Sequence, residues 1–94
     1  MNLTEDVQQG YQAKQLLENE VYKRAMENIR SGIVEKWRSC PVRDIEGQHE
    51  LKLMDKLLSD LEGYIKQVVD TGKMAEIQLE NERRMQLVKQ SGIR

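Results

Sequence analysis

The clearest pattern in the chain is a row of apolar residues, spaced alternately three and four positions apart, in its second half. This spacing places all of them on one side of an α-helix and resembles the contact row of a coiled coil. Asp44 is a good helix N-cap before the row, and Gly72 fits the position that follows a helix end. We therefore predict a helix over about residues 44–70. The row consists of Leu51, Met54, Leu58, Leu61, Ile65 and Val68.

A second apolar stripe, in the first half of the chain, predicts a helix over about residues 4–39. Pro41 ends it, because proline cannot continue a helix and disfavours helical geometry in the preceding residue. A glycine at the edge of the stripe, Gly32, either allows a close helix approach or is a tolerated defect of about 1 kcal/mol. The stripe contains Val7, Tyr11, Tyr22, Ala25, Met26, Ile29, Ile33 and Trp37.

The short link between these two helices favours an antiparallel helical hairpin. In that arrangement the row that begins at Leu51 packs against Tyr22, Met26, Ile29, Ile33 and Trp37. We expect Trp37 to be a core anchor that meets Leu51 near the closed end of the hairpin.

Beyond Gly72 a weaker stripe predicts a shorter C-terminal helix or tail over about residues 73–90. Asn81 interrupts this stripe, and its two methionines make it an adaptable candidate strip for a partner protein. A helix continuing straight through Gly72 would point the strip roughly opposite to the row that ends at Val68. Its apolar members are Met74, Ile77, Met85 and Val88.

Both long helices also carry apolar residues outside their main stripes. A single pair of helices gives each helix one contact face, so further helices are needed to cover these residues, most simply those of another copy. We therefore expect one all-α domain over residues 1–94 that forms a homo-oligomeric helical bundle, with a dimeric four-helix bundle as its simplest form. The additional residues are Leu16, Leu17, Val21, Val34, Leu53, Leu57 and Tyr64.

Composition restricts the class of protein. The 94 residues are 38% hydrophobic and 33% charged, with a formal net charge of -1, which suits one small helical domain and excludes a multi-domain enzyme. No apolar run reaches the roughly 20 residues that a membrane-spanning helix needs. The first residues lack the pattern of a signal peptide, so we expect a cytoplasmic protein with no membrane partner.

Few residues offer catalytic or metal chemistry. Cys40 and His49 are the only cysteine and histidine, which is too few for a zinc site. Glu46 and His49 have the spacing that di-iron bundles use, but His49 lies far round the helix from the row of Leu51, so we expect a solvated face. We predict no enzyme activity, no metal and no cofactor. The basic residues Arg83, Arg84 and Lys89 could contact phosphates, but a solvated tail is the favoured interpretation.

Residues 13–79 resemble a group of small helical proteins of unassigned function encoded by tailed bacteriophages. The likeness rests on residues 13–20, on Trp37 to Pro41, on residues 43–47, on Leu57 and Leu61, and on residues 72–75. This resemblance implies a helical accessory protein. From the group of phage proteins that it resembles, we infer a role in virion morphogenesis.

Three functions compete. The first is a structural or assembly protein that acts through protein–protein contacts, and the excess apolar surface favours it. The second is a small phage regulatory protein that binds and inhibits a host protein through the strip of residues 74–88. The third is a nucleic-acid-associated factor, which no recognition helix supports.

Overall fold

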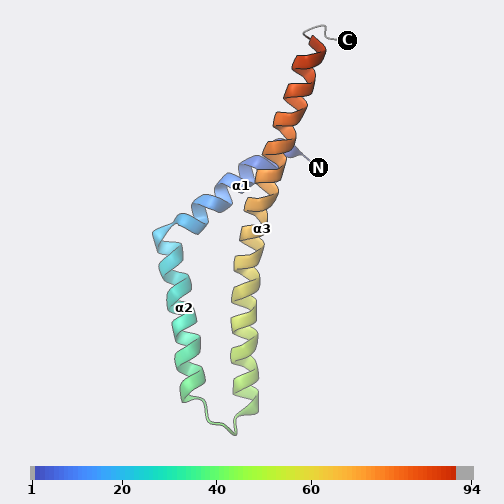
Figure 1. Ribbon diagram of the computed structural model, residues 1–94. Coiled ribbons are helices and arrows are strands. Elements are labelled where there is room, and N and C mark those ends of the chain that lie inside the picture. Colours follow the sequence, from blue (N-terminus) through green and yellow to red (C-terminus); the bar gives the residue numbers. More distant parts are fainter. Residues whose placement is uncertain (1, 91–94) are drawn as a thin grey trace. The chain divides into compact units, whose positions relative to one another are not determined.

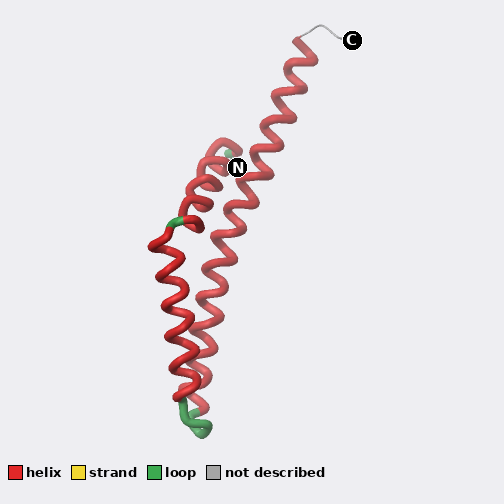
Figure 2. The backbone as a smooth tube through the Cα atoms, turned by 60° about the vertical axis from the view of Figure 1, so that its left-hand side comes forward, coloured by secondary structure: helices red, strands yellow, loops and turns green. Residues whose placement is uncertain are grey.

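The computed structural model describes residues 2–90, which form three α-helices and no strand. Helix α1 spans Leu3–Glu18, α2 spans Glu20–Ser39 and α3 spans Ile45–Gln90 (Figure 1). Figure 2 shows the non-helical segments between them in green. The prediction of an all-α protein is confirmed.

The chain packs as two compact units, although the sequence pattern predicts one helical domain over residues 1–94. Of the described residues, unit 1 contains residues 2–15 and 66–90, and unit 2 contains residues 16–65. Helix α3 contributes its C-terminal half to unit 1 and its N-terminal half to unit 2.

The prediction of one helix over residues 4–39 is wrong, because the helix is interrupted at Asn19. This residue has extended geometry, with φ -68° and ψ 127°, and its side-chain oxygen accepts a hydrogen bond of 2.9 Å from the backbone N–H of Tyr22. Asparagine competes in this way with the backbone for hydrogen bonds, which makes it a poor interior residue and a good N-cap. Asn19 therefore ends α1 and begins α2.

The connection between α2 and α3 follows the prediction. Helix α2 ends at Ser39, and Cys40 before the proline is extended, with φ -70° and ψ 127°. The side chain of Asp44 accepts a hydrogen bond of 2.9 Å from the backbone N–H of Gly47, which caps the first turn of α3. The side-chain amide of Gln48 donates hydrogen bonds to the carbonyl oxygens of Pro41 and Val42, which connects the link between α2 and α3 to the first turns of α3.

Helix α3 corrects the predicted boundary near residue 70 and the separate helix over residues 73–90. It continues without interruption through Gly72, which is a buried helical residue and not a helix-ending one. Burial recurs every seven residues along the helix, at Leu51, Leu58, Ile65 and Gly72. Gly72 thus occupies the next position of the apolar row, but as a glycine it gives no hydrophobic signal in the sequence.

The core of unit 2 is small and apolar. Helix α2 and the first part of α3 lie side by side in both ribbon views (Figures 1 and 2). Met26 of α2 and Leu51, Leu58 and Ile65 of α3 are the buried hydrophobic residues of this unit, each less than a tenth exposed. An ion pair between Arg30 and Glu62 joins the same two helices.

Candidate interaction surfaces

The contact between α1 and α3 in unit 1 is built on two glycines. Gly10 and Gly72 are both buried, and a Cβ atom added to Gly10 would lie 2.8 Å from the Cα atom of Gly72. A Cβ atom added to Gly72 would lie 2.7 Å from the Cα atom of Gly10 and 2.9 Å from the carbonyl oxygen of Asp6. The backbones therefore meet at a distance that only glycine permits. Ala75, at 4% exposure, continues the contact with another small residue.

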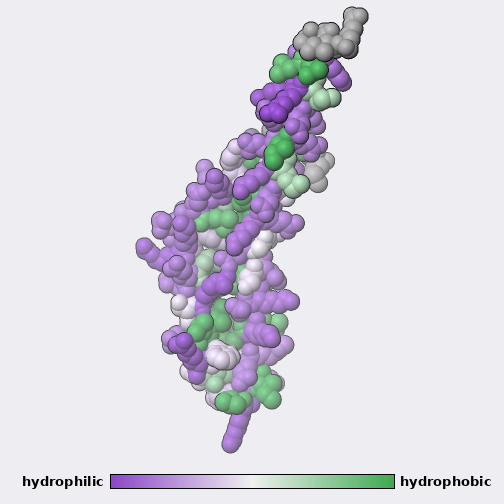
Figure 3. All heavy atoms as spheres, viewed as in Figure 1, coloured by the Kyte–Doolittle hydropathy of each residue, from purple (hydrophilic) through white to green (hydrophobic). Residues whose placement is uncertain are grey.

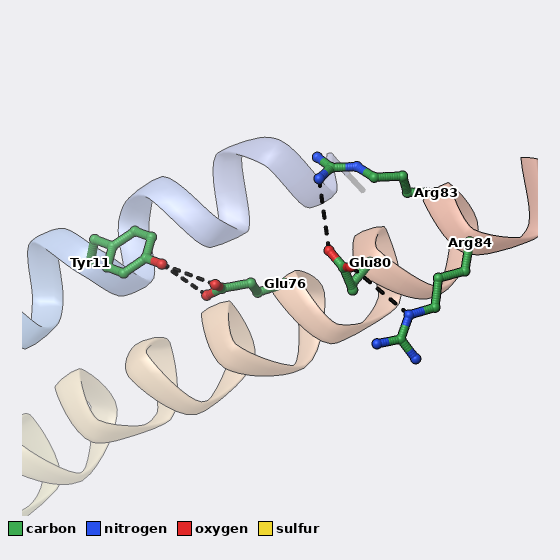
Figure 4. Close-up of polar contacts among 5 residues, drawn as sticks. All are labelled: Tyr11, Glu76, Glu80, Arg83 and Arg84. Atoms are coloured by element: carbon green, nitrogen blue, oxygen red, sulfur yellow. Dashed lines mark hydrogen bonds and ion pairs between the residues drawn. The ribbon is translucent and has the colours of Figure 1, made fainter. Parts of the chain in front are cut away.

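A hydrogen bond fixes the same pair of helices at the surface of unit 1. The hydroxyl of Tyr11 donates to the carboxylate of Glu76, with distances of 3.1 and 3.0 Å to its two oxygens (Figure 4). This hydrogen bond, together with the negative charge of Glu76, raises the pKa of Tyr11 above its ordinary value of 10.0. Both effects favour the protonated hydroxyl, which is the form that donates.

The row of α3 is only partly buried in the single chain. Leu51, Leu58 and Ile65 are buried and Val68 is half-buried, whereas Met54 and Leu61 are almost half exposed. The predicted partners on α2 divide in the same way. Met26 is buried, Tyr22 and Ile33 are half-buried, and Ile29 and Trp37 are exposed.

Trp37 corrects one expectation. Its side chain is 61% exposed, so it is not a core anchor of the single chain. Trp37 and Leu51 both line a groove of unit 2 that Ile33 and Val34 also border. Trp37 lies in the last turn of α2, where it lines this groove and remains open to solvent.

The candidate strip of α3 is exposed. Met74, Ile77, Met85 and Val88 have exposed fractions between 49% and 71%. Because α3 is continuous through Gly72, the centre of the strip lies about 180° round the helix from Gly72, which packs against α1, and about 120° from Ala75. Figure 3 shows apolar side chains in green among polar ones in purple along this part of the molecule.

Arg83 and Arg84, near the C-terminal end of α3, make ion pairs within their own helix, and Lys89 is exposed in the last turn. Arg83 and Arg84 each lie 3.9 Å from the carboxylate of Glu80, which stands between them (Figure 4). Glu80 therefore offsets part of their positive charge.

The residues with reactive side chains are not assembled into a site. His49 is exposed on the first turns of α3, and burial together with the charge of Asp44 raises the pKa of the Cys40 thiol, which disfavours the reactive thiolate. Over residues 2–90, no group of three or more His, Cys, Asp or Glu side chains is placed to hold a metal ion.

Comparison with protein families, with curated proteins and with solved structures gives no match to this chain. Among the described helices, none combines the length and the apolar character needed to cross a membrane. The candidate interaction features are therefore the exposed apolar residues of α2 and α3 and the close contact of Gly10 with Gly72.

The glycine contact was not predicted from the sequence. The signal that could have found it is the seven-residue repeat, since the row from Leu51 through Leu58 and Ile65 next falls on Gly72. A small residue at a repeat position indicates that a neighbouring backbone comes close.

Proposed function

We propose that this chain is a non-enzymatic helical accessory protein of a tailed bacteriophage that acts in virion morphogenesis through protein–protein contacts. Its unit of assembly is an antiparallel hairpin of α2 and α3 that self-associates into a helical bundle. It works in the host cytoplasm, either as part of the particle or as a helper of its assembly. The resemblance of residues 13–79 to small phage proteins supports the phage origin.

The observation that carries this proposal is an exposed apolar row on α3. Leu53, Leu57, Leu61 and Tyr64 follow one another at spacings of four, four and three residues, and each is between 47% and 72% exposed. Single exposed apolar residues are common on proteins, but a row at helical spacing is the pattern of a contact face. Another helix packed along α3 would bury this row, and a second copy of the chain supplies such a helix.

The imbalance between core and surface supports the same interpretation. Among the described residues five hydrophobic side chains are buried, and eighteen large ones are exposed. A chain of this size has little core to stabilise it alone, and oligomerisation is a common way to add buried area.

The experiment that tests the proposal is a measurement of solution mass by size-exclusion chromatography with light scattering, at two protein concentrations and two salt concentrations. We expect a dimer or larger oligomer that persists at high salt, because apolar burial is not screened by ions. A monomer under all four conditions would overturn self-assembly.

The matched variants are Leu57→Asp and Lys56→Asp. The first places a charge in the exposed row, and the second changes the charge at a neighbouring exposed position. We expect only Leu57→Asp to lower the mass. Detection of the chain in purified particles then separates a component of the virion from an assembly helper.

A small regulatory protein that binds and inhibits a host protein is the second candidate. The exposed strip of Met74, Ile77, Met85 and Val88 favours it, because an amphipathic helix can lie in an apolar groove of another protein. A chain that is monomeric under all four conditions would support this function.

A further inference from the structure

The C-terminal end of α3 has little packing to stabilise it within the chain. Every residue from Glu80 to Gln90 is exposed, and α3 runs on past the end of α1 in Figure 1. Isolated helices shorter than about 12–15 residues are marginal in water, and most helix stability in proteins comes from packing of an apolar face. A partner laid against this end would supply that packing.

The apolar face at this end is the strip of residues 74–88. At 100° per residue, Met74, Ile77, Met85 and Val88 lie within an arc of about 80°, and Asn81 lies near its centre. The arc is on the opposite side of α3 from Gly72, so α1 does not obstruct it. A helix could therefore lie along the whole strip.

The strip has the same spacing in both directions from Asn81. Ile77 and Met85 are each four residues away from Asn81, and Met74 and Val88 are each seven residues away. In an antiparallel pair of α3 helices centred on Asn81, Met74 would therefore lie level with Val88 of the second copy, and Ile77 with Met85 of the second copy. Asn81 would lie level with itself. Such symmetry is what a two-fold contact between identical chains requires.

The polar residues of the strip suit the same arrangement. A carboxamide carries both donors and an acceptor, so two Asn81 side chains across a two-fold axis can satisfy each other. Glu80 and Arg84 lie on one flank of the strip, already 3.9 Å apart within the helix. In the antiparallel pair each Arg84 would lie within about one turn of Glu80 of the second copy, and a guanidinium has enough donors for two carboxylates.

We propose that residues 74–88 of α3 are a self-association surface that pairs with the same segment of a second copy in antiparallel orientation, centred on Asn81. This inference rests on the proposed function and specifies one of its contacts. The opposed helix dipoles of an antiparallel pair favour the same orientation.

Disulfide cross-linking of the full chain tests the orientation. In a Cys40→Ser background, Asn81→Cys places a thiol at the centre of the proposed contact, and Gln86→Cys places one about 140° away on the helix. With oxidised glutathione as the oxidant, we expect Asn81→Cys to form covalent dimer about tenfold faster or more, because contact raises the local thiol concentration to about the millimolar range.

Two further variants separate antiparallel from parallel pairing. In the same background, Ile77→Cys alone should cross-link no faster than Gln86→Cys, whereas a mixture of Ile77→Cys with Met85→Cys should give a mixed dimer. Efficient self-cross-linking of Ile77→Cys would overturn the antiparallel arrangement, because only in a parallel pair does every residue meet its own copy.

The outcomes distinguish this inference from the proposed function. If the full chain is an oligomer and Asn81→Cys cross-links no faster than Gln86→Cys, the strip is not the contact, while self-assembly stands on the row of Leu57. If the chain is monomeric and no variant cross-links, both proposals fall and a host partner is the remaining occupant of the strip.

Discussion

Gly10 and Gly72 bring α1 and α3 together so closely that a methyl group on either one would overlap the backbone of the other helix. A Cβ atom on Gly10 or on Gly72 would lie only 2.8 or 2.7 Å from the opposite Cα atom, and the obstacle is backbone and not a side chain that could rotate away. The contact therefore depends on two hydrogen atoms in place of two side chains.

Gly72→Ala should destabilise unit 1 by about 1–3 kcal/mol, the usual cost of forcing an extra methyl group into a close contact. Gly63→Ala is the matched control, because Gly63 also lies within α3 but has open space around it. The control should gain up to about 1 kcal/mol from the better helix propensity of alanine. Thermal unfolding followed by circular dichroism measures both, and equal shifts in the two variants would contradict the close contact.

Asn19→Ala should lower the free energy of unfolding by about 1 kcal/mol, because it removes the side chain that caps α2 at the backbone N–H of Tyr22. Asn28→Ala, at an exposed interior position of the same helix, is the control and should be neutral or slightly stabilising. Urea unfolding of the two variants gives the comparison. An Asn19→Ala protein as stable as the control would show that the cap contributes nothing.

Tyr22→Phe should raise the free energy of unfolding by about 1 kcal/mol. The hydroxyl of Tyr22 is buried without a hydrogen-bond partner among the described residues, and removing an unsatisfied buried group removes its desolvation cost. Tyr64→Phe, at an exposed tyrosine, should leave stability unchanged. Urea unfolding tests the pair, and a destabilised Tyr22→Phe would reveal a hydrogen bond to this hydroxyl.

The hydrogen bond from Tyr11 to Glu76 makes stability depend on pH at the alkaline end. Because folding raises the pKa of Tyr11, the contribution is fully present below the unfolded value near 10 and is lost as the pH rises through the folded value. Tyrosinate absorbance can follow this group alone in a Tyr22→Phe, Tyr64→Phe protein. Glu76→Ala should return the pKa of Tyr11 towards its ordinary value, and an unchanged titration would exclude Glu76 as the cause.

Leu58→Asp should destabilise unit 2 by about 3–5 kcal/mol, since it removes a buried side chain and places an unpaired charge at a position that is 8% exposed. Lys56, two positions earlier, is exposed and lies outside the proposed contact row, and Lys56→Asp should change the stability of the folded chain by no more than about 0.5 kcal/mol. Helicity against urea concentration distinguishes them. Similar losses in both would mean that the register of α3 is misassigned.

The helical class, the link at Pro41 and the buried positions Leu51, Leu58 and Ile65 could be predicted from the sequence, because each depends on local propensity or on hydrophobic spacing. The break at Asn19 could not be predicted from the apolar stripe, because one non-helical residue hardly disturbs a periodic pattern. The continuity of α3 was missed for a related reason. Glycine is common after helix ends, and only the opposite helix shows that Gly72 serves a close contact.

For the candidate surfaces too, features set by local spacing could be predicted and features set by tertiary packing could not. The exposed strip of residues 74–88 could be located from the sequence, since its spacing is local. The exposure of Trp37 could not be predicted, because Trp37 continues the apolar stripe of its helix and only the packing of the folded chain shows that it stays exposed. The identity of a binding partner and the number of copies in an oligomer could not be predicted, because both also depend on the surfaces of other molecules.

The interruption at Asn19 separates the cooperative melting of α1 from that of α2. A continuous helix transmits fraying from turn to turn, whereas a capped break lets each side begin its own hydrogen-bond ladder. Gly10 is the one buried residue of α1, so we expect α1 to separate from α3 more readily than α2 separates from its own contacts with α3. If α1 separates from α3, Gly72 and Ala75 become exposed to solvent, while the cap at Asn19 still holds the first turn of α2.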